Sequence, residues 1–231
     1  MAAIRLQDAT IDLHLWRMIC ERPDLEMLGL SESDVGDEHL AAAVPTANGL
    51  AVSLKRTRVT DAGLSNLSRA IHIYRLDLSE THVGHSGLAA LPAMTELYSL
   101  AIERTMISDT SLNSIGRLSQ LHLLYLRGDR ITGKTLSALR NCDQLISLDL
   151  SETQLQDDNV AQLETLPGLR LLELDATPVT DRCVPGLKRL KRLRRLSVRD
   201  TRLSARALGD LRTTLPQCEI EPAAPRSNGV P

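Results

Sequence analysis

The sequence predicts an α/β solenoid, with a parallel sheet on its concave face and short helices on its convex face. Three observations support this prediction. A 24-residue period runs without insertion or deletion from residue 25 to residue 216, which gives eight units. Each unit has apolar residues at a strand spacing and then apolar residues at a helical spacing. The 231-residue chain contains no Phe, and an aliphatic core suits thin, similar layers.

The strand of each unit is predicted from its fourth and sixth positions, because side chains two residues apart point to the same face of a strand. The fourth positions are Leu28, Val52, Leu76, Leu100, Leu124, Leu148, Leu172 and Leu196. The sixteenth and nineteenth positions, such as Leu64 and Leu67, have the spacing of one helical face. No unit can bury its apolar face alone, so neighbouring units must stack.

The corner between strand and helix carries Ser or Thr at the twelfth position and Asp at the thirteenth, as in Thr60 and Asp61. The hydroxyl can cap the helix, and the acid suits its positive end. We interpret this Asp as a feature of the helix start and not as a catalytic acid.

The ninth position of most units holds Thr, and it predicts a buried hydrogen-bonding ladder. Its residues are Ser33, Thr57, Thr81, Thr105, Asp129, Thr153, Thr177 and Thr201. A side chain stacked once per unit can bond the backbone at the corner, where an unpaired group would cost about 1–3 kcal/mol. We therefore expect a structural row and not a row of nucleophiles.

The pattern LxxLxLxxTxVTDxGLxxLxxL is almost complete in residues 52–67 and 145–163, and it resembles the leucine-rich repeat. It is most similar to the 24-residue variant of bacterial repeat proteins, in which Thr replaces Asn. The segment 211–220 also resembles the end of such arrays. The resemblance covers residues 25 to about 220. It implies a right-handed leucine-rich-repeat solenoid, an arc whose sheet lines the concave face.

An open solenoid needs a cap at each end. Residues 1–24 predict an N-terminal capping helix, which Pro23 ends. Its expected inner face is formed by Ile11, Leu15, Met18 and Ile19, with Trp16 alongside. Residues 25–216 form the eight repeats, and residues 217–231 are expected to form a C-terminal cap and a disordered tail. In this cap, Ile220 would take the fourth position of an incomplete ninth unit.

Composition and motifs argue against several classes of function. The net charge is −2, so no overall field attracts nucleic acid or a membrane. No apolar run is long enough to span a membrane, and residues 1–20 lack the apolar core of a signal peptide. The four cysteines are widely spaced and predict reduced thiols. We expect a cytoplasmic protein, with export lacking a classical signal peptide left open.

Enzyme signatures such as GxSxG, GxxxxGK[ST] and HExxH are absent from the sequence. Only His82 and His85 lie close together among the histidines, and we interpret them as surface residues. We therefore expect no enzyme activity, no cofactor and no metal.

The predicted binding surface is the concave sheet, where the second, third, fifth, seventh and eighth positions face outward. All three tyrosines fall there, and Tyr74, Tyr98, His122 and Ile146 would form one row on strands about 4.8 Å apart. Exposed aromatic groups are typical of binding hot spots. The alternative is that the tyrosines only shield leucines from water.

Charge is segregated on the same face, with basic residues in the middle, an acidic cluster next and a basic C-terminal end. The predicted partner-binding residues are Tyr74, Arg75, Tyr98, Arg104, His122, Tyr125, Arg127, Asp149, Glu173, Asp175, Arg195 and Arg199. The C-terminal arginines could contact phosphate groups. They have few aromatic neighbours that could stack on bases, so nucleic-acid binding is not expected.

The sequence thus predicts a monomeric, non-catalytic scaffold that binds a protein partner through the concave sheet. Three alternatives stay open. One is a bacterial effector secreted by the type III route that acts in a host cell. The second is the substrate-recognition subunit of a ubiquitin ligase. The third is RNA binding through residues 194–202.

Overall fold

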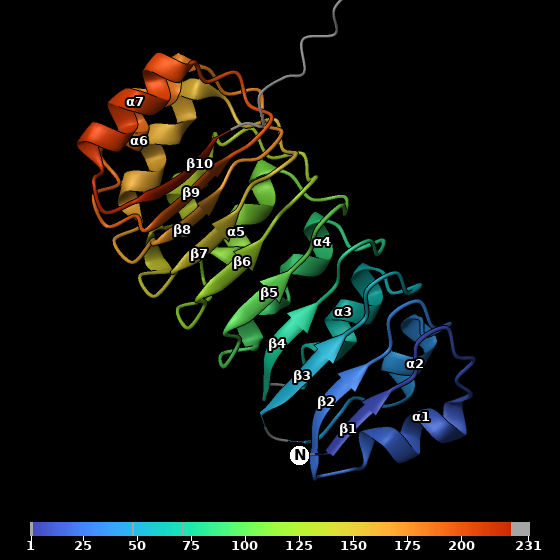
Figure 1. The fold of residues 1–231 in the computed structure, drawn as a ribbon. Helices are drawn as coiled ribbons and strands as arrows, with labels where there is room; N and C mark the ends of the chain where they lie inside the picture. Colours follow the sequence, from blue (N-terminus) through green and yellow to red (C-terminus); the bar gives the residue numbers. More distant parts are fainter. Residues whose placement is uncertain (1, 48, 71, 223–231) are drawn as a thin grey trace, which may run out of the picture.

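The computed structural model describes residues 2–47, 49–70 and 72–222. Ten strands form one sheet in sequence order, and every neighbouring pair is parallel. Figure 1 shows the strands stacked along a curved array, with the short helices on one side of the sheet. This is the predicted solenoid.

The strands are β1 (Ala2–Arg5), β2 (Leu25–Gly29), β3 (Leu50–Ser53), β4 (Ile73–Asp77), β5 (Ser99–Ala101), β6 (Leu123–Tyr125), β7 (Ser147–Asp149), β8 (Leu171–Glu173), β9 (Arg195–Val198) and β10 (Glu219–Pro222). Strand pairing places equivalent positions of successive units side by side, as in Leu28, Val52 and Leu76. A shift of 24 residues along the sequence therefore equals one step across the sheet.

The convex side holds short α-helices and 3₁₀-helices. They are α1 (Leu13–Cys20), α2 (Asp37–Ala42), α3 (Asp61–Leu67), α4 (His85–Leu88), η1 (Leu91–Ala93), η2 (Asp109–Ser111), α5 (Leu112–Ile115), η3 (Leu136–Asn141), η4 (Asp157–Thr165), η5 (Asp181–Cys183), α6 (Val184–Leu187) and α7 (Ala205–Thr214). Helices are about 10 Å wide, whereas strands lie about 4.8 Å apart, so the convex side must be longer than the sheet. This difference in width curves the array.

The core is one continuous, mainly aliphatic cluster between the sheet and the helices, and it includes Trp16. The fourth-position residues are all buried, with exposed fractions of 3% or less. The four cysteines are free and buried. Burial raises the pKa of the Cys142 thiol to about 11, so this group stays protonated near neutral pH.

The ninth-position ladder is confirmed in seven units. Each hydroxyl donates to the carbonyl oxygen three residues earlier, for example from Thr57 to Leu54 at 2.6 Å and from Thr153 to Leu150 at 2.6 Å. The other five rungs begin at Ser33, Thr81, Thr105, Thr177 and Thr201. The eighth residue is Asp129, which cannot donate in this way when it is ionised.

The Asp at the thirteenth position does more than the predicted helix start. Its carboxylate accepts hydrogen bonds from the twelfth residue of the next unit. Asp157, for instance, accepts from the Thr180 backbone N–H at 2.7 Å and from the Thr180 hydroxyl at 2.7 Å. Asp37 binds Thr60 in the same way. The carboxylate therefore connects successive units, a role that analysis within one unit did not reveal.

The N-terminal cap contains a strand, β1, that the sequence did not predict, and the predicted inner face of its helix is partly wrong. Leu15 and Met18 are 38% and 55% exposed, whereas Trp16 is completely buried. The helix begins only at Leu13, after the N-cap Asp12. Burial within so short a helix follows Trp16, Ile19 and Cys20, which lie three and four residues apart.

At the other end, Ile220 pairs with Leu196, as expected for the fourth position of an incomplete ninth unit. The predicted disordered tail falls mainly on residues 223–231, which lie outside the described residues.

Candidate functional site

The face of the sheet opposite the helices carries most of the predicted binding residues. In the ribbon of Figure 1, the helices follow one side of the sheet and leave its other face open. Each strand pairs with the next in parallel, so that equivalent residues of successive units lie level with each other. Side chains at equivalent positions of neighbouring units therefore form rows across an uncovered surface.

The first row contains the aromatic residues. Tyr98 donates its backbone N–H to the carbonyl oxygen of Tyr74 at 2.8 Å, and His122 donates to Tyr98 at 2.8 Å. Ile146 continues the row with a bond to His122 at 2.9 Å. The Tyr98 and His122 rings stack with centroids 4.3 Å apart and an interplanar angle of 22°. Tyr74 and Tyr98 are each 37% exposed, so the row presents aromatic surface to solvent.

Tyr125 lies in the middle of the face, close to several acidic residues. It is half-buried, and this burial raises the pKa of its phenol, while the positive charge of Arg75 opposes the shift. Burial also raises the pKa of Glu103 and Glu173, and the charge of Asp149 adds to both shifts. The centre of the face therefore combines an aromatic ring with a concentrated negative field.

Asp149 itself is only 5% exposed, and one of its oxygens accepts a hydrogen bond from the Ser151 backbone at 2.7 Å. Its predicted contact with a partner is thus limited by burial. The main contribution of Asp149 is charge.

Arg104 and Arg127 both bind the same carboxylate. Arg104 lies 2.7 Å from Glu152, and Arg127 lies 2.6 Å from it. The two guanidinium groups lower the pKa of Glu152. Glu152 was not among the predicted binding residues, because its position in the sequence gives no sign that it joins two arginines.

Gly128 makes room for the Arg104 side chain as it passes over the intervening unit. A Cβ atom on Gly128 would lie 2.7 Å from the Cγ atom of Arg104, and the glycine φ is +75°. Residues at the equivalent position of other units, such as Arg56 and Ala176, also have a positive φ. The space that the Arg104 side chain occupies, and not the φ angle, therefore favours glycine here. The glycine therefore supports an ion pair between units that are not neighbours.

At the C-terminal end, Arg195 and Arg199 both bind Glu221, with Arg195 Nε at 2.6 Å from a carboxylate oxygen. Asp175 accepts hydrogen bonds from the Ser197 hydroxyl at 2.6 Å and from the Arg199 backbone at 2.8 Å. These three predicted binding residues are therefore engaged within the protein.

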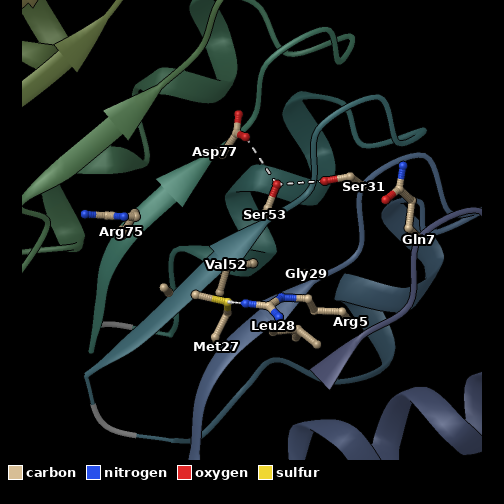
Figure 2. A pocket seen from close by; sticks show the side chains of 11 residues that line it. Arg5, Gln7, Met27, Leu28, Gly29, Ser31, Val52, Ser53, Arg75 and Asp77 are labelled. Carbon is tan, nitrogen blue, oxygen red and sulfur yellow. Dashed lines mark hydrogen bonds between the residues drawn. The ribbon is translucent and has the colours of Figure 1, made fainter. Parts of the chain in front are cut away.

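A hollow in the surface of β1–β4 was missed by the sequence analysis. Its volume is about 300 Å³, and its lining includes Arg5, Met27, Ser53, Arg75 and Asp77 (Figure 2). Arg75 is the only predicted binding residue that reaches it. The signal in the sequence was a run of small residues at outward positions of two neighbouring units.

Two further classes of site were searched for in the part of the chain that the structure describes. No group of three or more His, Cys, Asp or Glu residues is arranged to hold a metal ion there. Within the same residues, no helix is both long and apolar enough to cross a membrane.

The architecture is similar to that of two solved internalins from Listeria monocytogenes. Internalin C2 aligns with a TM-score of 0.62 and 21% identity, over 92% of this chain and 84% of that protein. The internalin inlF aligns with a TM-score of 0.57 and 18% identity, over 86% and 69% of the two chains. The chain has the leucine-rich-repeat fold. No protein-family model matches this leucine-rich-repeat sequence, and no curated protein matches it either.

Proposed function

We propose that this leucine-rich-repeat protein is a non-catalytic scaffold that binds a protein partner through its concave sheet. The observation that carries the proposal is the aromatic row. Tyr74, Tyr98 and His122 lie side by side on the uncovered face, and Tyr125 lies on the same surface. Exposed aromatic rings gathered on one face are typical of the anchors that dominate protein interfaces.

The rigidity of the surface supports the proposal. Seven hydroxyl rungs fix the corners, and Asp carboxylates such as those of Asp37 and Asp157 connect neighbouring units. The aromatic side chains therefore stand on a backbone that needs little ordering when a partner binds. Preorganisation of this kind raises affinity, because less conformational entropy is lost.

Charge complementarity would orient the partner. Glu173 lies two strands from Tyr125 with its side chain exposed, and Arg75 is exposed on β4. Arg104, Arg127, Arg195 and Arg199 could contact a partner only while sharing or releasing Glu152 and Glu221. We therefore place the anchors on the aromatic row and assign the paired arginines a secondary role.

Affinity capture from a lysate of the source cells tests the proposal, with the combined variant Tyr74→Ala/Tyr98→Ala/Tyr125→Ala as the comparison. The matched control is Met106→Ala, since Met106 is 64% exposed and lies outside the strands. Circular dichroism checks that all the proteins are folded. We expect one set of proteins to bind the wild type and Met106→Ala and to be lost with the tyrosine variant.

Capture of the same proteins by the tyrosine variant would show that the tyrosines only shield the core. The identity of a tyrosine-dependent partner also tests the finer predictions. A tyrosine-dependent partner captured only from a lysate of host cells would favour the effector hypothesis. A ligase subunit would favour the ubiquitin-ligase hypothesis.

A further inference from the structure

The hollow on β1–β4 differs in character from the aromatic row. Its floor is formed largely by Met27, Gly29, Ala51 and Val52. Gly29 and Ala51 project little from the sheet, and a Cβ atom on Gly29 would find its nearest neighbour, Arg5 Cγ, at 3.5 Å. The hollow therefore results from small residues at outward positions, and a side chain of ordinary size could occupy it.

One wall of the hollow is polar, and its groups are already bonded to one another. The Ser31 and Ser53 hydroxyl oxygens lie 3.0 Å apart, and Ser53 donates to Asp77 at 3.2 Å. Asp77 also accepts from the Ser79 backbone N–H at 2.9 Å. Figure 2 shows this chain of hydrogen bonds along one side of the apolar floor. Because these groups are bonded to one another, the main attraction for a ligand in the hollow is apolar.

Two exposed arginines border the hollow, Arg5 on β1 and Arg75 on β4. In Figure 2 the Arg5 side chain runs toward Met27, whereas the Arg75 side chain points away from β3. Within the described chain, the side chain of Arg5 contacts the Met27 sulfur at 3.4 Å and neither arginine forms an ion pair. The nearby Glu80 is bound by Lys55 and Arg56. The hollow thus has an apolar floor, two bordering arginines that can donate to carboxylates, and the Asp77 carboxylate in its polar wall.

We propose that this hollow receives an extended segment of a protein partner that presents one aliphatic side chain between two carboxylates. The inference rests on the proposed function, because it assigns one part of the partner to one part of the concave face. Strands β1 and β4 are three steps apart, and Arg75 lies two residues before Asp77, the residue level with Arg5. The Cα atoms of the two arginines are therefore about 16 Å apart. An extended chain rises about 3.4 Å per residue, so two acidic residues four positions apart span about 14 Å, with the aliphatic residue midway. The long arginine side chains can reach across the remaining distance.

The probe is the peptide acetyl-Glu-Ser-Leu-Ser-Glu-amide, and its binding is followed through the ¹³C-labelled methyl group of Met27. The Met27→Leu variant assigns this resonance. We expect a saturable shift at millimolar peptide. The analogue with Gln in place of both Glu residues should bind about ten-fold more weakly, because two partly exposed ion pairs are lost. The analogue with Ser in place of Leu should also bind more weakly, since it leaves the floor uncovered.

Three variants locate the binding. Gly29→Val fills the hollow and should abolish binding. Arg5→Gln/Arg75→Gln removes the positive charge and should reduce the affinity about ten-fold. The matched control is Arg170→Gln, because Arg170 is an exposed arginine on a distant unit and it should leave binding unchanged. Absence of a saturable shift, equal binding of the Gln peptide, or full binding by Gly29→Val would each overturn the inference.

The same peptide separates this inference from the proposed function. The combined tyrosine variant leaves the hollow intact and should bind the peptide as the wild type does. Failure of the peptide together with tyrosine-dependent partner capture would reject only the role of the hollow. Peptide binding without tyrosine-dependent capture would reject only the aromatic row.

Discussion

Asp129 replaces the hydroxyl residue in one rung of the ladder, and it makes stability depend on pH. Its Oδ1 atom accepts from the Thr105 backbone at 2.8 Å and lies 3.2 Å from the Thr105 hydroxyl oxygen, whose one proton it shares with the Ile102 carbonyl oxygen. Its Oδ2 atom is buried without a hydrogen-bond partner among the described residues. Asp129 is 2% exposed. Burial raises the pKa of its carboxyl from 3.8 to about 7, and the hydrogen bonds from Thr105 oppose this rise.

The sign of the effect follows from this raised pKa. Below about pH 4 the carboxyl is protonated in both the folded and the unfolded state. Between about pH 4 and pH 7 the unfolded chain ionises while the folded protein keeps its proton, so the free energy of unfolding falls as pH rises. One pH unit corresponds to about 1.4 kcal/mol, and the full loss is therefore about 4 kcal/mol. Above pH 7 both states are ionised, and no further loss occurs.

The Asp129→Asn variant tests this reasoning, because the amide cannot ionise and supplies an N–H donor as well as an acceptor. We expect its free energy of unfolding to match that of the wild type near pH 4 and to exceed it by about 4 kcal/mol at pH 8. Urea unfolding followed by circular dichroism at constant ionic strength measures both proteins across this range. Asp129→Thr, which restores a hydroxyl, should show the same pH dependence relative to the wild type.

A difference between wild type and Asp129→Asn that does not change with pH would refute the reasoning. It would mean that the folded protein solvates the charged carboxylate as well as water does. Groups elsewhere in the chain do not complicate the comparison, because their titration is common to both proteins. Glu103 is the exception to examine, since its charge contributes to the raised pKa of Asp129.

Two further predictions concern contacts between units, and urea unfolding measures both. Asp157→Ala removes both hydrogen bonds to Thr180 and should lower the free energy of unfolding by about 1–3 kcal/mol. The control Asp158→Ala should lower it far less, because the Asp158 side chain is 81% exposed. Equal losses would show that the link between units is not stabilising. Gly128→Ala introduces a Cβ atom 2.7 Å from the Cγ atom of Arg104 and should cost about 1–2 kcal/mol, because the site is overpacked. The φ angle adds little, since Ala176 has a positive φ at the equivalent position. Gly209→Ala, in the helix α7 with open space around it, should instead stabilise by up to about 1 kcal/mol. An unchanged midpoint for Gly128→Ala would show that the Arg104 side chain moves aside without cost.

The sequence by itself determined the repeat, its register and the ladder. These features depend on contacts that are local or strictly periodic. The Thr57 hydroxyl donates to a carbonyl oxygen only three residues away. The aromatic row follows because residues 24 positions apart lie on neighbouring strands. The residue type and the period therefore specify the neighbour.

Only the tertiary structure decided which side chains are engaged in contacts within the protein and which remain free to contact a partner. Arg104 reaches Glu152 across an entire unit, and the helix face at Trp16 depends on where the first helix begins. The hollow beside Arg75 exists because small residues of adjacent strands coincide. These contacts depend on side-chain direction and on the size of neighbours in space, and no periodic pattern encodes either quantity.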